Sequence, residues 1–210
     1  MNRTALIISK IVVWIAALVP LGVVVYQAVT NTLGPDPSAA IADDTGQTTL
    51  WMLAILLAIT PLRRMVPQLN WLIKFRRLVG LFVFFYATVH LSAYVGLYAG
   101  FDPHVMLTDI TKRRFIIVGF TAWLLMLPLA VTSTTWAIRK MGGRNWNRLH
   151  QLVYLAAIAA DIHYWWKVKT GVLSPAPYTL VLTVLLLARP VLWWAHRRKM
   201  SGAAVRPAVS

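Results

Sequence analysis

Three histidines lie within long apolar segments of the chain. His90 occurs in FYATVHLSAY, while His150 and His163 both occur in LHQLVYLAAIAADIHYWW, whose one charged residue is Asp161. An ionisable side chain in a membrane-like segment is energetically costly, so it usually faces the protein interior, a water-filled cavity or a cofactor. Imidazole binds metals and transfers protons. These histidines are therefore the first candidates for the chemistry of the protein.

The segments that carry them belong to a chain that is apolar almost throughout. Of its 210 residues, 59% are hydrophobic and 13% are charged, and the mean hydropathy is +0.64. Six charge-poor segments approach or exceed the roughly 20 residues that a helix needs to cross a bilayer: residues 11–35, 45–62, 78–101, 115–138, 149–166 and 170–196. We therefore expect an all-α fold, a polytopic membrane bundle of six transmembrane helices. Residues 1–210 would form a single domain, with a short disordered tail from about residue 201.

The basic residues predict the orientation of this bundle. The net charge is +15, and most Lys and Arg residues fall in loops on one side, including Arg63, Arg64 and Arg139. Because cytoplasmic loops retain Lys and Arg, both termini are predicted to be cytoplasmic, and the charge reflects topology rather than nucleic-acid binding. Residues 31–47, rich in Gly, Pro, Asp and small side chains, are predicted to form an exposed external loop. GFDPHVMLTDITKRR is predicted to form the second external loop.

His90 and His163 are predicted to lie at the same depth on antiparallel helices. His90 lies about 12 residues, or roughly 18 Å, beyond the cytoplasmic start of its segment, and His163 lies near the outer end of its own. Two imidazoles at matched depth are how a helical bundle holds a b-type haem. A zinc or copper site would need further ligands, but the chain has no cysteine and no Glu or other His at that depth. The alternative to a haem ligand is that His90 only forms a hydrogen bond to a neighbouring helix.

His150 is a weaker candidate, for a second and inner haem. It lies about 20 Å from His163 along the helix axis, but on an ideal helix the two side chains point about 140° apart. The facing position on the neighbouring helix is Arg77, which would pair with a haem propionate, occupy the distal side of an inner haem, or serve only as a cytoplasmic charge. Whether there are one or two haems stays open. His104 and His196 are expected to be solvated or interfacial.

Three stretches together resemble a known family: RRLVGL…ATVHLSAY (76–94), LAVTST (129–134) and WNRLHQLVYLAAIAADIHYWWKVK (146–169). They are similar to the MsrQ family, formerly YedZ, the haem-binding membrane subunits of bacterial periplasmic methionine sulfoxide reductase systems. That family belongs to the ferric-reductase-like transmembrane superfamily, which also contains the NADPH oxidases. The resemblance implies that His90, His150 and His163 are axial ligands of haem iron. It also implies FMN as a further cofactor.

The resemblance implies a location and partners as well. The chain would be a multi-pass protein of the bacterial inner membrane, the electron-transfer subunit of an oxidoreductase complex, without substrate chemistry of its own. It would pass electrons to an MsrP-like periplasmic molybdopterin reductase that repairs oxidised proteins. Because no glycine-rich nucleotide fingerprint is present, the electrons would come from a cytoplasmic flavin reductase or from membrane quinol. Outer cationic residues would steer an acidic partner or pair with propionates: Lys112, Arg113, Arg114, Lys167 and Lys169.

One departure from the wider superfamily and two rival functions accompany this interpretation. The segment of His90 carries a single histidine, whereas ferric reductases and NADPH oxidases commonly carry two on each of two helices. A small transporter or proton-conducting protein would use His90, Asp161 and His163 as a relay, but the sequence lacks the paired repeats and broken helices typical of transporters. A purely structural membrane anchor would leave the buried histidines unexplained.

Overall fold

The computed structural model describes residues 2–168 and 174–203, and every regular element in these two ranges is helical. The elements are α1 (Arg3–Val29), α2 (Pro37–Met65), the 3₁₀ helix η1 (Pro67–Lys74), α3 (Arg76–Ala93), the π-helical turn η2 (Tyr94–Tyr98), α4 (Pro103–Lys112), α5 (Arg114–Val131), α6 (Thr135–Met141), α7 (Gly143–Leu149), α8 (Leu152–Lys167) and α9 (Ala176–Ala203). The predicted all-α fold is confirmed for these residues. Of the predicted tail, residues 201–203 belong to α9 and the rest lies outside the described residues, as do Lys169 and the side chain of His196.

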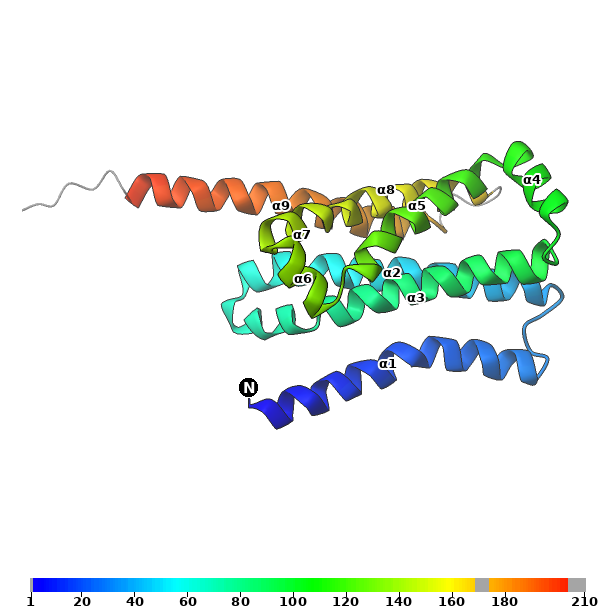
Figure 1. Cartoon of the computed structure of the whole chain (residues 1–210), viewed down its shortest axis with the longest axis horizontal. Helices are drawn as coiled ribbons and strands as arrows, with labels where there is room; N and C mark the ends of the chain where they lie inside the picture. Colours follow the sequence, from blue (N-terminus) through cyan, green and yellow to red (C-terminus); the bar gives the residue numbers. More distant parts are fainter. Residues whose placement is uncertain (1, 169–173, 204–210) are drawn as a thin grey trace, which may run out of the picture.

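The long helices form an elongated bundle. α1, α2, α3, α5, α8 and α9 run along the long axis of the molecule, whereas η1, α6 and α7 lie at the end that holds the N-terminus and α4 lies at the opposite end (Figure 1). Four helical segments are long and apolar enough to cross a membrane, namely α1, α2, α3 with η2, and α5. α8 and the apolar part of α9 (Ala176–Leu192) are shorter. The described residues thus indicate a multi-pass membrane protein with four candidate spans, where the sequence predicts six.

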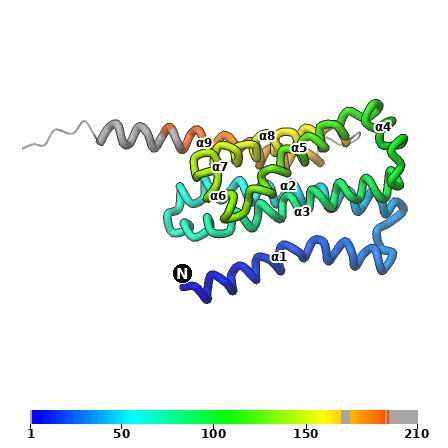
Figure 2. The backbone as a smooth tube through the Cα atoms, viewed as in Figure 1, coloured from blue at the N-terminus to red at the C-terminus, as the bar shows by residue number. Residues whose placement is uncertain are grey.

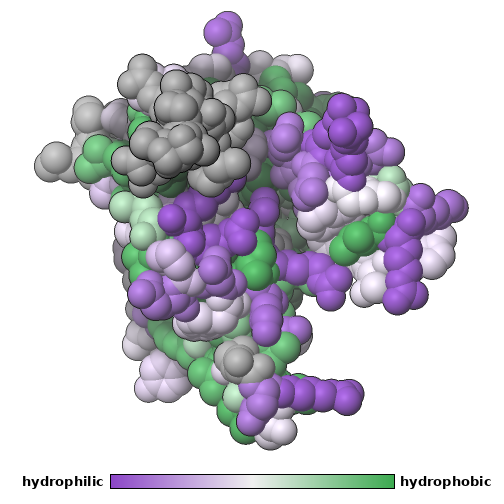
Figure 3. Space-filling model, turned by 90° about the vertical axis from the view of Figure 1, so that its left-hand side faces the viewer, coloured by the Kyte–Doolittle hydropathy of each residue, from purple (hydrophilic) through white to green (hydrophobic). Residues whose placement is uncertain are grey.

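The end of the bundle that carries η1 and α7 is hydrophilic. Figure 3 looks onto this end and shows hydrophilic side chains gathered across it. Several helices finish here in basic residues, with Arg63 and Arg64 in the last turn of α2, Lys74 in that of η1, and Arg139 and Lys140 in that of α6. Cations interact favourably with helix C-termini, and their clustering at one end is typical of one membrane surface.

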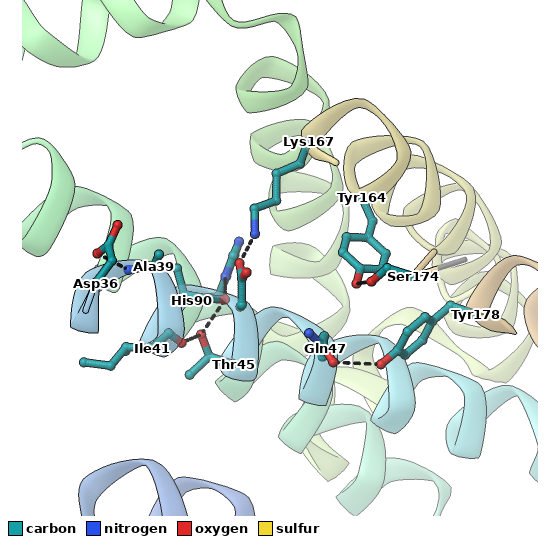
Figure 4. Close-up of polar contacts among 12 residues, drawn as sticks. Asp36, Ala39, Ile41, Thr45, Gln47, His90, Tyr164, Lys167, Ser174 and Tyr178 are labelled. Carbon is teal, nitrogen blue, oxygen red and sulfur yellow. Dashed lines mark hydrogen bonds and ion pairs between the residues drawn. The ribbon is translucent and has the colours of Figure 1, made fainter. Parts of the chain in front are cut away.

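The predicted external loop at residues 31–47 is wrong beyond residue 36, because α2 begins at Pro37. Asp36 caps this helix by accepting a hydrogen bond from the backbone N–H of Ala39 at 2.9 Å (Figure 4). Proline fits the first turn of a helix, where its missing N–H would have no partner. Within the supposed loop Thr45 is buried, and its hydroxyl donates to the Ile41 carbonyl at 2.7 Å. α2 therefore extends about two turns farther toward the α4 end than predicted.

Two other predicted segments also differ from the structure. The second external loop contains α4, which is capped by Asp102 through a 2.8 Å hydrogen bond from the backbone N–H of His104. The apolar segment at residues 115–138 divides into α5, which ends at Val131, and α6, which begins at Thr135. Thr134 caps α6, because its hydroxyl oxygen accepts a hydrogen bond from the backbone N–H of Ala137 at 3.1 Å.

The centre of the bundle is an apolar core between two helix pairs, α2–α3 and α5–α8, within each of which the helices pack extensively. Leu53 and Leu57 of α2, Val83 of α3 and Ala156 of α8 are almost fully buried there. Small side chains such as Ala156 let membrane helices approach closely. The core holds the two pairs together, and the cavities described below lie between the pairs.

α1 lies along the outside of this bundle (Figure 2), with Ala17 and Val24 as its buried residues. It is joined to α3 through Tyr86, whose hydroxyl donates to the Ala17 carbonyl at 2.7 Å and accepts from the Leu21 N–H at 3.1 Å. In an uninterrupted helix that carbonyl and that N–H bond to each other. The hydroxyl is therefore inserted into one turn of α1, beside Pro20.

We expect Tyr86→Phe to loosen α1 and to lower the stability of the protein by about 1 kcal/mol, because the two backbone groups of α1 lose their bridge. Thermal unfolding of the detergent-solubilised variant measures this loss as a lower midpoint. Tyr26→Phe is the matched control, because Tyr26 is an exposed tyrosine of the same helix. Equal midpoints for the two variants would contradict the bridging role of Tyr86.

Candidate cofactor site

A cavity of about 940 Å³ lies between the two helix pairs, toward α4. We call it the His90–His163 cavity, because both side chains line it. Its volume lies in the range of cofactor-sized pockets, about 300–1,000 Å³. Its walls are mainly apolar and aromatic, and include Leu50, Phe120 and Trp123. An apolar wall with a few polar groups is the usual setting of a buried cofactor.

Each of these histidines is held by a backbone carbonyl of the neighbouring helix. Nδ1 of His90 lies 2.8 Å from the Ala42 oxygen of α2, and Nδ1 of His163 lies 2.7 Å from the Phe115 oxygen of α5. Because a carbonyl only accepts, each Nδ1 carries the proton and donates it. In a neutral imidazole Nε2 then keeps its lone pair. Metal-binding histidines are usually oriented in this way.

The two imidazole rings lie close enough to share one metal ion. Their centroids are 5.9 Å apart and their planes make an angle of 81°. A metal–imidazole bond is about 2 Å long and a ring nitrogen lies roughly 1 Å from the ring centre, so two rings on opposite sides of one ion have centroids about 6 Å apart. Among the described residues, no group of three or more His, Cys, Asp or Glu could hold a bare metal ion. The pair therefore fits haem iron, which needs only two axial ligands from the protein.

Basic side chains line the mouth of this cavity. Lys167 reaches from α8 toward α2 (Figure 4) and forms an ion pair with Asp43. Arg113 forms an ion pair with Asp109 of α4 at 3.3 Å. Cations in such a place are suitable partners for carboxylates such as haem propionates, and the lining contains four: Lys112, Arg113, Arg114 and Lys167.

A second cavity, of about 430 Å³, lies near η1 and α7. We call it the His150 cavity. Arg77 also lines it, so the structure brings together the two residues that the sequence suggested for an inner site. Lys74 and Arg76 add two further cations, and the part of the chain that the structure describes contributes no second histidine and no acidic residue to the lining.

His150 is held by a ring contact and a hydrogen bond at its Nε2. Its ring stacks on that of Trp146, with centroids 3.7 Å apart and an angle of 26° between the planes. Its Nε2 lies 3.2 Å from the Thr132 hydroxyl oxygen, and the Trp146 indole N–H donates to the Thr132 carbonyl at 2.9 Å. In contrast to His90 and His163, the nitrogen that would bind iron is already hydrogen-bonded.

His150 and His163 do not belong to one continuous helix, contrary to the prediction for residues 149–166. α7 and α8 are separated by a tight turn at His150, in which the Gln151 N–H bonds the Arg148 carbonyl at 3.1 Å. The angle of about 140° expected on an ideal helix therefore does not apply. Both histidines line cavities in the interior of the bundle, at opposite ends of α8.

Asp161 is not among the residues that line either cavity. Its carboxylate accepts a hydrogen bond from the Thr179 hydroxyl, with distances of 2.8 and 3.0 Å to its two oxygens. The Thr179 oxygen in turn accepts from the Trp165 indole N–H at 2.6 Å. This network ties α8 to α9. A relay through His90, Asp161 and His163 therefore lacks its carboxylate, because Asp161 is bonded to α9 instead.

Sequence reasoning missed the part of the site that comes from α2. Ala42, Asp43 and Gly46 all line the His90–His163 cavity, although all three lie in the stretch predicted to be a loop. Gly119 of α5 lines the same cavity. The signal that could have placed these residues on a helix is the Asp36–Pro37 pair, because a capping side chain followed by proline is typical of a helix start.

Comparison with known proteins shows the family of this chain. Residues 45–160 match the family model described as ferric reductase like transmembrane component. The chain is 43% identical over 201 residues to the protein-methionine-sulfoxide reductase heme-binding subunit MsrQ of Herminiimonas arsenicoxydans, a match that covers 95% of this chain and 92% of that protein. It is 43% identical to MsrQ of Ralstonia nicotianae, with the same two coverages. It is 46% identical to MsrQ of Xanthomonas oryzae pv. oryzae, over 88% of this chain and 87% of that protein.

Both the extent of these matches and the paired imidazoles between the two helix pairs lead to the same assignment. The chain belongs to the ferric reductase-like transmembrane family and, within it, to the MsrQ heme-binding subunits of protein-methionine-sulfoxide reductase.

Proposed function

We propose that the protein is a b-type cytochrome of the bacterial inner membrane that supplies electrons to a periplasmic MsrP-like molybdopterin enzyme, which reduces methionine sulfoxide in oxidised proteins. The observation that carries this proposal is the pair His90 and His163, whose rings lie 5.9 Å apart with both Nδ1 atoms bonded to carbonyls. A haem iron held by two imidazoles supplies one-electron transfer. The residues of the chain hold this group, orient it and keep water away from it.

In this proposal His90 and His163 would hold the haem iron. The carbonyls of Ala42 and Phe115 keep the proton on Nδ1 of each ring, which increases the basicity of the ligating Nε2. The apolar walls of the cavity exclude water and so influence the reduction potential. Arg114 and the other cations that line the cavity would bind the propionates.

The same proposal places the molecule in the membrane. α8 and α9 complete six crossings with the four candidate spans, and the hydrophilic end in Figure 3, with its basic helix ends, faces the cytoplasm. Both termini are then cytoplasmic, and the His90–His163 cavity lies near the periplasmic side. The periplasmic partner would approach over α4 and the cationic mouth of the cavity, which attracts an acidic surface.

The His150 cavity would receive electrons at the cytoplasmic end, from a flavin reductase or from quinol. Its cations, Lys74, Arg76 and Arg77, suit an anionic redox group. A second bis-histidine haem would need an imidazole opposite His150, and the described lining provides none. We therefore propose FMN, whose phosphate the cations would bind, and keep a haem ligated by His150 as the alternative.

We expect His90→Ala and His163→Ala each to abolish the bis-histidine haem spectrum, because either change removes one of the two imidazoles and the described lining contains no third histidine. Haem quantification and absorption spectra of the purified proteins, oxidised and dithionite-reduced, measure this effect. His104→Ala, on the exposed surface of α4, should leave haem content and spectrum unchanged. The pairing is wrong if either cavity variant keeps its full haem content, and a colourless, folded wild-type protein would overturn the cytochrome function altogether.

For the second cavity we expect one haem and one FMN per chain. Arg77→Ala should weaken FMN binding roughly tenfold or more, since a hydrogen bond to a charged group contributes about 1.5–3 kcal/mol, while haem content stays constant. The control is Arg139→Ala, an exposed arginine at the same end that does not line the cavity. Cofactor extraction and fluorescence titration of FMN give both quantities. Two haems per chain, falling to one in His150→Ala, would contradict the FMN assignment and support the alternative.

A further inference from the structure

The two histidines of the His90–His163 cavity are held by one arrangement that occurs twice. His90 follows the residue of its carbonyl acceptor, Ala42, by 48 positions, and His163 follows its acceptor, Phe115, by the same 48 positions. In each case a glycine lies four residues after the acceptor, Gly46 in α2 and Gly119 in α5. The helix pairs α2–α3 and α5–α8 thus place a carbonyl, a glycine and a histidine in the same order.

Both glycines lie directly against the imidazole rings. A Cβ atom at Gly119 would lie 2.5 Å from Nδ1 and 2.7 Å from Cε1 of His163. A Cβ atom at Gly46 would lie 3.1 Å from both Nδ1 and Cε1 of His90. The contact at Gly119 is too short for any side chain, and the contact at Gly46 is tighter than ordinary van der Waals contact. Each ring therefore occupies the space that a side chain of the facing helix would otherwise fill.

The position of these glycines follows from the geometry of a helix. A helical carbonyl bonds the N–H of the residue four positions later, and the side chain of that later residue covers the outer side of the oxygen. The same two helices show this with threonines, because the Thr49 hydroxyl bonds the Thr45 carbonyl and the Thr121 hydroxyl bonds the Ile117 carbonyl, both at 2.8 Å. A glycine at that position leaves room for a whole imidazole ring to approach the oxygen from another helix.

Backbone conformation does not explain either glycine. Gly46 and Gly119 lie inside α2 and α5 and are absent from the glycines with positive φ, which are Gly34, Gly100 and Gly142. A glycine in the middle of a helix costs about 0.5–1 kcal/mol relative to alanine. The chain carries this cost at two positions, each where an imidazole meets a helix.

We infer that Gly46 and Gly119 are positioning residues for the two haem ligands, since each makes room for the Nδ1–H of a histidine to bond a helix carbonyl and so fixes the orientation of that imidazole ring. This inference rests on the proposed haem function. The three atoms nearest to a Cβ at either glycine all belong to the imidazole ring, so the glycines act on the cofactor through the orientation of its ligands.

The test compares Gly119→Ala and Gly46→Ala with Gly22→Ala in the purified full-length protein. Gly22 is a matched control, because it also lies inside a membrane-spanning helix and a Cβ atom there would meet nothing within 4 Å. We expect haem affinity to fall roughly 10- to 100-fold in Gly119→Ala, as is typical when the support of a metal ligand is lost. Gly46→Ala should show a smaller loss, because its clash is milder, and Gly22→Ala should show none.

Haem affinity is followed as haem transfer to excess apomyoglobin, and the ferric low-spin EPR spectrum reports the angle between the imidazole planes. Thermal unfolding of the haem-free proteins provides an independent readout. Gly119→Ala in a His163→Ala background should be at least as stable as His163→Ala alone, because the clash disappears with the ring and alanine favours the helix. This double variant keeps the test decisive even if Gly119→Ala alone misfolds.

Wild-type haem transfer and an unchanged EPR spectrum in Gly119→Ala would overturn the inference, and so would an equal loss of haem in Gly22→Ala. A destabilised double variant would overturn it as well, because the glycine would then be needed for something other than the ring. A wild-type protein without haem would instead overturn the proposed function, so the two failures are distinguishable.

Discussion

Two hydrogen bonds from imidazole N–H groups to helix carbonyls determine the geometry of the cofactor site. One joins α3 to α2 and the other joins α8 to α5, so each histidine is oriented within its own helix pair. The separation between the rings then depends on how the two pairs pack against each other. Nearly inaccessible side chains such as Leu53 and Ala156 hold that packing, since a close-packed interior leaves little freedom for one pair to shift relative to the other.

The same bonds make the site compatible with a bilayer. An imidazole without a partner in an apolar environment carries a high cost, and here each ring has one nitrogen satisfied by protein and one available for a metal. Asp161 shows the other way to accommodate a polar group at this depth, because its carboxylate is satisfied by Thr179 and contributes to the contact between α8 and α9. The polar residues of the bundle therefore divide into those that prepare the cavity and those that join helices.

Part of this arrangement could be predicted from the sequence. Helix class, membrane character and the meeting of His90 with His163 follow from hydropathy and depth alone, because these depend on helix rise and direction. The start of α2 was not predicted, since the Gly, Pro, Asp and small side chains of residues 31–47 favoured a loop, although Asp36 and Pro37 indicate a helix start. The relation between His150 and His163 could not be calculated, because a turn interrupts the helix between them. Gly46 and Gly119 could not be recognised either, because a glycine in an apolar segment gives no indication of which side chain will lie against it.

The attachment of α1 has a consequence for how the sequence can change over time. α1 contributes no residue to the lining of either cavity, and it is joined to α3 where the Tyr86 hydroxyl enters the turn at Ala17 and Leu21. Most of its side chains therefore need only to be compatible with lipid, and one apolar residue can replace another there without altering the chemistry of the bundle. α2 and α5 have no such freedom around the rings, because one added carbon atom is too close to the ring at Gly119 and tight against it at Gly46. Tolerance to substitution should accordingly be uneven along the chain, wide in the first helix and narrow on the faces that enclose the imidazoles.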